Sequence, residues 1–162
     1  RYLATAGDDA GDGAAAAAGE VLATTSRDGF RTDVVSGVHR LVADEPVDVP
    51  GGTDLGPSPY DLLSAALASC TSMTLRMYAN HKGIDADTFT VGVRHDRIHA
   101  KDCEECETKD GHIDRFVRRI NVRGDFDDDV RRRLLEIADR CPVHRTLHSE
   151  VLVETDWRDN TT

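Results

Sequence analysis

Four cysteines, at positions 70, 103, 106 and 141, carry the chemistry that this sequence offers most plainly. A chain of 162 residues can bury a core of its own, so it does not need these cysteines as disulfide staples. A secreted disulfide framework would come with a signal peptide and a smaller core, and the sequence suggests neither. The four thiols therefore predict redox or metal chemistry.

Cys141 precedes Pro142 at the expected start of a short helix that runs to about His148. Unpaired backbone N–H groups and the helix dipole at such a place favour a thiolate. A thiol with an ordinary pKa of about 8.5 is only slightly ionised at neutral pH, so a fall of about two units would make it mostly thiolate. His144 and Arg145 lie on the same face of that turn. The alternative interpretation of Cys141 is an ordinary helix cap.

Cys70 lies in the middle of a helix that we expect over Pro59 to His81, with Gly83 beyond its end. The stretch from Leu62 to Leu75 is apolar or small on nearly every side, which indicates a helix that is buried all round. Taken alone, Cys70 is better interpreted as a small core residue, the usual fate of an intracellular cysteine.

Cys103 and Cys106 form a C-x-x-C pair flanked by His99 and His112. Two Cys and two His this close together could form a tetrahedral zinc site, and these four are the candidate ligands. The spacing is not that of a standard zinc finger, so a redox dithiol and a passive surface loop stand beside zinc as interpretations. No other cofactor is expected. His95 has no evident partner in the sequence, and we expect no role for it.

Short β-prone runs, turn residues and two kinds of helix surround these cysteines. Runs punctuated by Arg27-Asp28-Gly29 and Ser36-Gly37 predict an antiparallel meander. The expected strands are Val21–Thr25, Phe30–Ser36, Val38–Ala43, Thr88–His99, Ile113–Arg123 and Glu150–Trp157, with an amphipathic helix over Asp127–Arg140. This order predicts an α+β fold, an antiparallel sheet wrapped on a long buried central helix. Such a helix needs more cover than one small sheet gives, so we expect a homodimer.

The domain boundaries follow from composition. Residues 1–19 are rich in Gly, Ala and Asp and predict a flexible arm, residues 20–157 a single domain, and residues 158–162 a tail. The connection from Pro46 to Pro59 is rich in Pro and Gly, and a loop of this length in a compact domain is more often functional than idle.

The net charge of −10 combines an excess of Asp with a scarcity of Lys. Such a surface repels nucleic acid and anionic membranes, because phosphate binding needs a basic stripe. No stretch approaches the roughly 20 apolar residues of a membrane helix, so we expect a soluble, cytoplasmic protein. The same composition suits a salt-adapted organism.

Two segments resemble the signatures of the OsmC/Ohr family, the osmotically inducible and organic hydroperoxide resistance proteins. GPSPYDLLSAALASCTSMTL, which contains Cys70, is similar to the first signature, and IADRCPVH, which contains Cys141, is similar to the second. Ala43-Asp-Glu-Pro46 and Gly51-Gly52 resemble a subgroup with a DEP…GG…GP.PYDLL run. The resemblance covers about residues 20–157 and implies an intertwined homodimer with active sites near the subunit interface.

The resemblance also implies a thiol-dependent peroxidase in oxidative and osmotic stress defence, acting on organic hydroperoxides with hydrogen peroxide as a poorer substrate. The Cys70 thiolate would attack the O–O bond and leave an alcohol and a sulfenic acid. Cys141 would condense with that sulfenic acid to a disulfide, which a dithiol reductant of the dihydrolipoyl type reopens. The family assigns the attack to Cys70, whereas the helix argument favours Cys141 as the more acidic thiol.

One departure from the family concerns the residues around the thiolate. Arg27 matches in context the family arginine that stabilises the thiolate and the leaving oxygen. The peroxidases of the family pair that arginine with a Glu ten residues before the first Cys, and here this position is Tyr60, with Asp61 next to it. Glu45 could replace the missing Glu from the preceding loop.

The missing Glu leaves two alternative functions open. One is a catalytically weak or inactive binding protein that keeps the fold, and the other is a zinc-binding structural or sensor protein built on Cys103 and Cys106. If the chain is a peroxidase, an apolar organic tail would be held by residues of the central helix. The candidate substrate-binding residues are Tyr60, Leu63, Leu67 and Met73.

Overall fold

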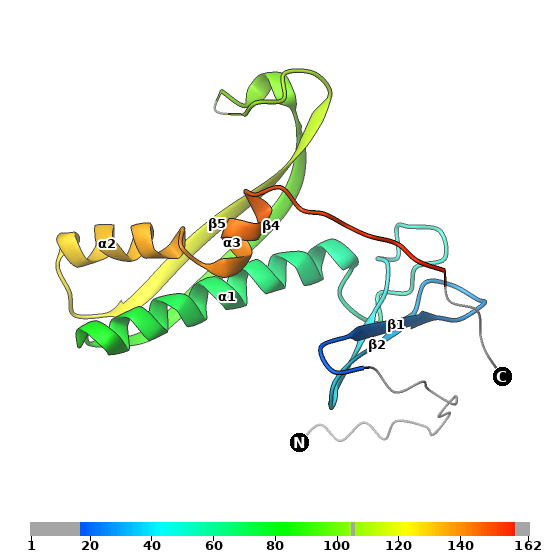
Figure 1. Ribbon diagram of the computed structural model, residues 1–162, viewed down its shortest axis with the longest axis horizontal. Coiled ribbons are helices and arrows are strands. Elements are labelled where there is room, and N and C mark those ends of the chain that lie inside the picture. The colour runs from blue at the N-terminus through cyan, green and yellow to red at the C-terminus, as the bar shows by residue number, and fades with distance from the viewer. Residues whose placement is uncertain (1–16, 105, 158–162) are drawn as a thin grey trace. The chain divides into compact units, whose positions relative to one another are not determined.

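The computed structural model describes residues 17–104 and 106–157 of the chain (Figure 1). The chain divides into two compact units between Pro59 and Tyr60. Residues 1–16 of the predicted arm and the predicted tail at 158–162 lie outside the described residues. The order of strands and helices is α+β with antiparallel sheets, as predicted.

The first unit holds an antiparallel meander of three strands in the order β1-β2-β3. The strands are β1 (Val21–Thr25), β2 (Thr32–Ser36) and β3 (His39–Ala43). Gly37, in the turn between β2 and β3, has a φ of 59°, a region that glycine adopts without strain. The predicted meander is confirmed, with β2 and β3 beginning one or two residues later than the β-prone runs suggest.

The loop after β3 is organised by one buried carboxylate, that of Asp44, which is 2% exposed. Its two oxygens accept hydrogen bonds from the Thr53 hydroxyl and from the backbone N–H groups of Glu45, Thr53 and Leu55. The bond from the Thr53 hydroxyl contributes most to holding the pKa of Asp44 below its ordinary value, and the backbone N–H groups add to it against the opposing effect of burial. The acidic residue of the DEP run therefore builds the loop.

Two glycines of the same loop lie where no side chain fits. A Cβ on Gly52 would lie 2.3 Å from the carbonyl oxygen of Pro46, and one on Gly56 would lie 2.0 Å from that of Val42. These contacts are with backbone, which cannot move aside without disturbing β3 or the loop. The long Pro/Gly-rich connection is thus tightly folded.

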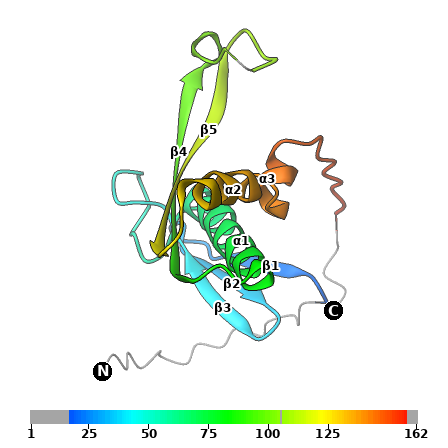
Figure 2. The ribbon, with the colours of Figure 1, turned by 90° about the vertical axis from the view of Figure 1, so that its left-hand side faces the viewer.

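The second unit combines a long hairpin with three helices. Its elements are α1 (Pro59–Lys82), β4 (Ala86–His99), the 3₁₀ helix η1 (Ala100–Asp102), β5 (His112–Gly124), α2 (Asp128–Ala138) and α3 (Pro142–Leu147). β4 pairs with β5 from Ala86↔Gly124 to His99↔His112. Figures 1 and 2 show that the end of this hairpin projects beyond the helices.

Side chains of α1 bind the backbone of β4 and fix the two elements against each other. Ser72 Oγ donates to the carbonyl oxygen of Phe89, and the Arg76 guanidinium donates to those of Ala86 and Asp87 at 2.7 Å each. These bonds set the position of the central turns of α1, where Cys70 lies.

The core of this unit sits where α1, α2 and the base of the hairpin meet. Its buried residues are Leu75, Leu134, Ile137 and Ala138, and the half-buried residues packed on them are Tyr78, Ile84, Phe89, Ile120, Val122, Phe126 and Val130. Asp127 caps α2 by accepting a hydrogen bond from the N–H of Val130 at 2.8 Å. Because α2 packs on α1, the residues that follow α2, including Cys141, lie close to α1.

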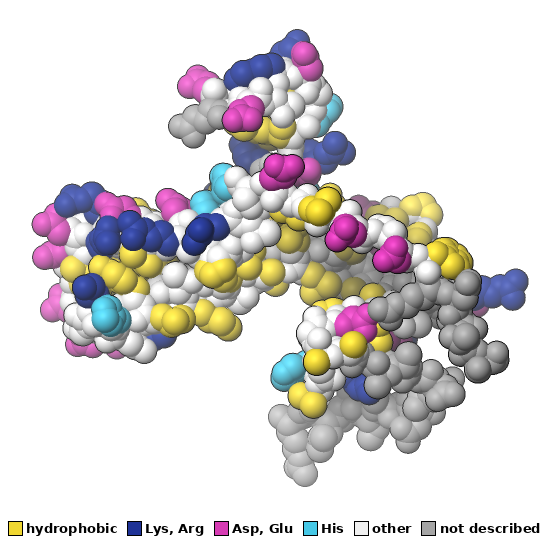
Figure 3. All heavy atoms as spheres, in the orientation of Figure 1, with side chains coloured by type: hydrophobic (Ala, Val, Ile, Leu, Met, Phe, Trp, Pro, Cys, Tyr) yellow, Lys and Arg dark blue, Asp and Glu magenta, His cyan; other side chains and the backbone are white. Residues whose placement is uncertain are grey.

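In the single chain α1 is buried along one face only, and the expected burial of its other faces depends on the predicted homodimer. Only one stripe is buried, which consists of Ser64, Leu67, Thr71, Leu75 and Ala79. On other faces Met73 is 65% and Met77 72% exposed, because the described residues cover one side of the helix and leave the rest bare. Figure 3 shows hydrophobic side chains gathered along α1.

The strand predicted at Glu150–Trp157 does not form. Residues 150–157 have no regular secondary structure and pair with no strand of the described chain. The segment has the residue pattern of a strand, but a strand also needs a partner for its backbone hydrogen bonds. Its apolar residues Val151, Leu152 and Val153 are exposed.

Within the ranges 17–104 and 106–157, no helix has the length and apolar character needed to cross a membrane.

Candidate functional site

The structure brings Cys70 and Cys141 together as a pair of free thiols. Cys70 comes from the middle of α1, and Cys141 comes from the corner between α2 and α3. The two thiols lie close enough for each to influence the pKa of the other. Cys141 is fully buried, whereas Cys70 is only half-buried. A dissolved reactant therefore reaches Cys70 more easily than Cys141.

Cys141 is the N-cap of α3, as the sequence predicts. Its φ of −57° and ψ of 133° are not helical, Pro142 follows in the first turn, and the N–H of His144 points at Sγ of Cys141 across 3.5 Å. A proline at this position disfavours helical geometry in the residue before it, so Pro142 holds Cys141 in the capping conformation.

The two thiols differ in acidity. Burial is the largest influence on each and raises the pKa of both. For Cys141 it is outweighed by hydrogen bonds to its sulfur from the N–H of His144, the Cys70 thiol, the Thr71 hydroxyl and the N–H of Val143, so the pKa of Cys141 lies below its ordinary value. For Cys70 it is reinforced by the bond to Cys141, so the pKa of Cys70 lies above its ordinary value.

It follows that, when the pair has lost one proton, the remaining proton lies on Cys70 and Cys141 is the thiolate. The Cys141 thiolate accepts a hydrogen bond from the Cys70 thiol and can take the proton that Cys70 must lose before it attacks. The acidity agrees with the helix argument from the sequence, and the exposure favours Cys70 as the sulfur that meets a reactant. An external oxidant can therefore oxidise the accessible Cys70 thiol, and Cys141 can then form a disulfide with it.

Arg118 of β5 is a site residue that the sequence reasoning missed. Its guanidinium donates to Thr71 Oγ1 at 3.1 Å, to the carbonyl oxygen of Ala138 at 3.0 Å and to Asp139 Oδ1 at 2.5 Å. Its side chain is 13% exposed. Since the Thr71 hydroxyl bonds the sulfur of Cys141, Arg118 polarises one of the donors that stabilise the thiolate.

A sequence signal for Arg118 exists. Arg118 lies two residues from both Phe116 and Ile120 on a strand, so the three side chains share one face. That face packs against the helices, and an apolar residue is expected there. An arginine at such a position needs buried acceptors.

His144 lies beside Cys141 as a half-buried ring. Burial lowers the pKa of His144 most, and electrostatic repulsion from His148 and Arg118 lowers it further, although the Asp139 carboxylate acts in the opposite direction. The ring is therefore neutral at pH 7, and the contribution of His144 to the thiolate comes from its backbone N–H.

A pocket of about 560 Å³ lies between the N-terminal half of α1, the hairpin and α3. Three of the predicted substrate-binding residues, Tyr60, Leu63 and Leu67, line it. The fourth, Met73, is not among its lining residues. It comes six positions after Leu67, which places it on another face of a helix with 3.6 residues per turn. Arg118 and His144, which flank Cys141, also line the pocket.

Tyr60, at the position where the sequence lacks the family's Glu, stacks on His95. The ring centroids are 4.2 Å apart with an angle of 7° between the planes, and His95 Nε2 lies 2.9 Å from Asp114 Oδ1. The expectation that His95 has no partner is therefore wrong. The sequence could not reveal it, because His95 and Asp114 meet only through the register of β4 and β5.

Arg27 and Glu45 both lie in the first unit, whereas Cys70 and Cys141 belong to the second. Arg27 is exposed in the turn between β1 and β2, and Glu45 follows β3 in the loop that Asp44 organises. Their assignment to the catalytic site stays a prediction.

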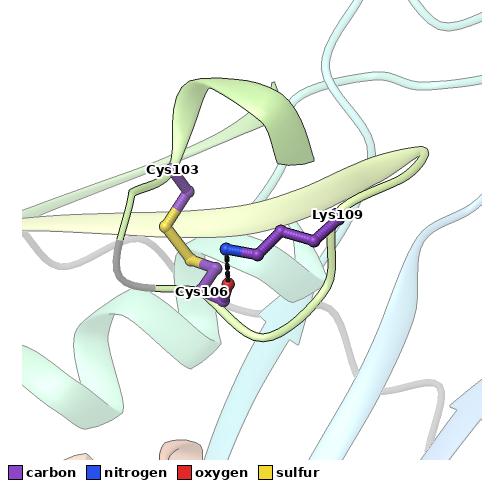
Figure 4. Close-up of a disulfide and its surroundings, with 3 residues drawn as sticks. All are labelled: Cys103, Cys106 and Lys109. Atoms are coloured by element: carbon purple, nitrogen blue, oxygen red, sulfur yellow. Dashed lines mark hydrogen bonds between the residues drawn. A yellow bond between two sulfur atoms is a disulfide. The ribbon is translucent and has the colours of Figure 1, made fainter.

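The predicted zinc site is not assembled. Cys103 and Cys106 are bonded to each other as a disulfide, so neither thiolate is available as a ligand (Figure 4). His99 and His112 stack on each other with ring centroids 4.2 Å apart. In the part of the chain that the structure describes, no group of three or more His, Cys, Asp and Glu side chains could hold a metal ion.

A family model described as OsmC-like protein matches residues 51–156. No curated protein matches the sequence.

Solved structures with the same fold include several described by related names. An OsmC-like protein from Mycoplasma pneumoniae aligns with a TM-score of 0.59 at 20% identity, over 80% of this chain and 86% of that one. An organic hydroperoxide resistance protein OsmC from Legionella pneumophila has a TM-score of 0.57 at 17% identity, over 79% and 87%. The organic hydroperoxide resistance protein OhrB of Bacillus subtilis has a TM-score of 0.55 at 22% identity, over 78% and 87%. At these identities the likeness establishes the fold.

Proposed function

Because the chain belongs to the OsmC-like protein family, we propose that it is a thiol peroxidase that reduces organic hydroperoxides through Cys70 and Cys141. The observation that carries this proposal is the pair of free thiols, in which a buried cysteine with a lowered pKa lies beside a more accessible one. An unreactive core cysteine would not need the donors that surround Cys141.

The first step oxidises Cys70. Cys70 passes its proton to the Cys141 thiolate, and the resulting Cys70 thiolate attacks the outer oxygen of the hydroperoxide. The O–O bond breaks, an S–O bond forms, and the alkoxide takes the proton from Cys141 to leave as an alcohol. Cys70 is then a sulfenic acid, and Cys141 is again a thiolate.

The second step closes the disulfide. The Cys141 thiolate attacks the sulfur of the Cys70 sulfenic acid, and hydroxide leaves and is protonated to water. Overall, two thiols and one hydroperoxide give a disulfide, an alcohol and water. A dithiol of the dihydrolipoyl type returns two electrons and two protons to the pair, and the reaction therefore suits a reducing compartment, the cytoplasm.

The pocket supports an organic rather than an inorganic peroxide. Leu63 and Leu67 offer apolar surface beside Tyr60, next to the half of α1 that carries Cys70. Hydrogen peroxide has no tail to fill that surface and is expected to be the poorer substrate. Names that include organic hydroperoxide resistance, borne by proteins with the same fold, point to the same class of substrate.

We assign Arg27 the stabilisation of the thiolate and the leaving oxygen, and Glu45 the orientation of Arg27. Both residues lie in the first unit, and in a homodimer either copy could supply them. A homodimer is supported by the exposed apolar face of α1, where Met73 and Met77 lie bare, since monomers rarely expose such a surface.

The test is consumption of cumene hydroperoxide by the reduced protein with dihydrolipoamide as donor. Cys70→Ser is expected to abolish consumption. Cys141→Ser is expected to leave Cys70 oxidisable but unable to close the internal disulfide. Ser69→Ala is the matched control, because its hydroxyl bonds only carbonyl oxygens of its own helix. No consumption by the wild type, with both thiols titrated as free, would overturn the proposal.

One observation favours a second function, a binding protein without turnover. Tyr60 occupies the position of the family's Glu. Its ring stacks on His95 and lines the pocket. In that case an apolar ligand would bind in the pocket of a protein that consumes no hydroperoxide.

A further inference from the structure

The end of the β4–β5 hairpin carries a second cysteine pair that the proposed mechanism does not use. Cys103 and Cys106 form a disulfide with their Cα atoms 5.5 Å apart, immediately after η1 (Figure 4). The other two cysteines, Cys70 and Cys141, are free thiols. The question is whether this bond holds the hairpin together or takes part in exchange.

The hairpin does not depend on the disulfide. The strands pair up to His99↔His112, and the N–H of Ala100 donates to the carbonyl oxygen of Gly111 at 2.9 Å beyond that point. The ladder is therefore closed before the chain reaches Cys103. A bond between residues only three apart also removes little freedom from the unfolded chain, because the stabilisation grows with the length of the closed loop.

The disulfide is placed where an external thiol can reach it. Both cysteines are half-buried, and both line the pocket at its hairpin end. The Lys109 ammonium donates to the carbonyl oxygen of Cys106 at 2.6 Å, as Figure 4 shows, so a positive charge lies next to this cysteine. A nearby cation favours the thiolate that a sulfur becomes when it leaves a disulfide.

The same pocket reaches the surroundings of the first cysteine pair. Its lining joins Cys103 and Cys106 to Arg118 and His144, which contact Thr71 and Cys141 respectively. A dithiol that enters at the hairpin end thus stands in one continuous cavity with the residues around Cys141.

We propose that Cys103 and Cys106 form a second redox site, which takes electrons from a small dithiol and passes them to the Cys70–Cys141 disulfide. The proposal rests on the proposed function, because it needs that disulfide as the acceptor. It gives the C-x-x-C pair the role of a thiol–disulfide relay.

The exchange balances in two stages. One thiolate of the dithiol attacks Sγ of Cys103, the bond to Cys106 breaks, and Cys106 leaves as a thiolate beside Lys109. The second thiol of the reductant then releases Cys103 and closes its own disulfide, so two electrons and two protons reach the pair. The reduced pair attacks the Cys70–Cys141 disulfide in the same manner, which restores Cys103–Cys106 and returns two thiols to the peroxidase site.

The decisive variant is Cys103→Ser/Cys106→Ser, measured in two ways beside the wild type. In the relay, prereduced protein still completes a single turnover at saturating cumene hydroperoxide, because the chemical step uses neither sulfur. Steady-state turnover with limiting dihydrolipoamide falls at least tenfold, because reduction of the Cys70–Cys141 disulfide becomes slow. Equal steady-state turnover would overturn the relay. A wild type that fails even the single turnover would instead overturn the proposed function.

A second measurement keeps the proposal testable if that variant folds poorly. In Cys70→Ser/Cys141→Ser, the Cys103–Cys106 pair is equilibrated with mixtures of reduced and oxidised lipoamide and its thiols are counted by mass after alkylation. A redox site titrates reversibly with two electrons. A disulfide that stays closed throughout is structural and refutes the relay, and so does a reduced pair that retains stoichiometric zinc.

Discussion

The acidity of Cys141 should depend on the Thr71 hydroxyl. This hydroxyl bonds the Cys141 sulfur and itself accepts a hydrogen bond from Arg118 at 3.1 Å. Thr71→Val keeps the shape of the side chain and removes both bonds. A hydrogen bond to a charged group contributes about 1.5 kcal/mol at the lower end of its range, and about 1.4 kcal/mol corresponds to one pKa unit. We therefore expect the lower apparent pKa of the thiol pair to rise by about one unit.

The assay is the ultraviolet absorbance of the thiolate as a function of pH, with Cys103 and Cys106 kept as a disulfide so that they do not titrate. Ser69→Ala, one helical position away from Cys70, is the control and should titrate like the wild type. At a pH well below the wild-type pKa, the thiolate fraction and the rate of a single turnover should both be about tenfold lower than in the wild type.

An unchanged titration in Thr71→Val would refute this reasoning, because the hydroxyl would then contribute nothing to the thiolate. The sign of the linkage gives a second readout. A thiol whose pKa is lower in the folded state adds stability above its unfolded pKa and loses it as the pH falls through the folded value. Thr71→Val should therefore weaken this increase in stability between neutral and alkaline pH.

Three further perturbations test other parts of the structure. Asp44→Asn should lower the thermal midpoint at pH 7, and the difference from wild type should shrink as the pH falls through the lowered pKa of Asp44, followed by calorimetry. Met73→Glu/Met77→Glu should convert a dimer into monomers in light scattering while the circular dichroism stays that of the wild type, and a dimer that persists would place the interface elsewhere. Tyr60→Ala removes the stack on His95 and should raise KM for cumene hydroperoxide more than for hydrogen peroxide, and equal changes would exclude Tyr60 from the binding of the organic tail.

Much of the fold could be predicted because its signals are local. The turn at Gly37 divides the meander, the small and apolar run predicts α1, and the Cys-Pro step predicts the start of α3 with Cys141 as its cap. Each of these depends on residues that are neighbours in sequence, whose conformational preferences act before tertiary contacts form.

The errors arose where a pattern needed a partner. The predicted strand at 150–157 has the right residues but no strand of the described chain to pair with. Composition indicates which side chains a segment could bury, but it does not show whether the chain provides the strand or surface that buries them.

In the site, too, the local features could be predicted and the tertiary contacts could not. Cys70 and Cys141 could be chosen from sequence, but their contact, the bond from Thr71 and the position of Arg118 depend on how α1, α2 and β5 pack together. The sequence also left the role of Cys103 and Cys106 open, because a C-x-x-C spacing suits a metal and a disulfide equally well.

The most direct test of the central claim is the stoichiometry of one turnover. Reduced protein is mixed with one equivalent of cumene hydroperoxide in the absence of a donor, and its peptides are mapped for disulfides by mass spectrometry. The proposed function predicts one equivalent of alcohol and a bond between Cys70 and Cys141. Hydroperoxide that remains while both thiols stay free, or alcohol formed with Cys70 and Cys141 still reduced, would contradict it.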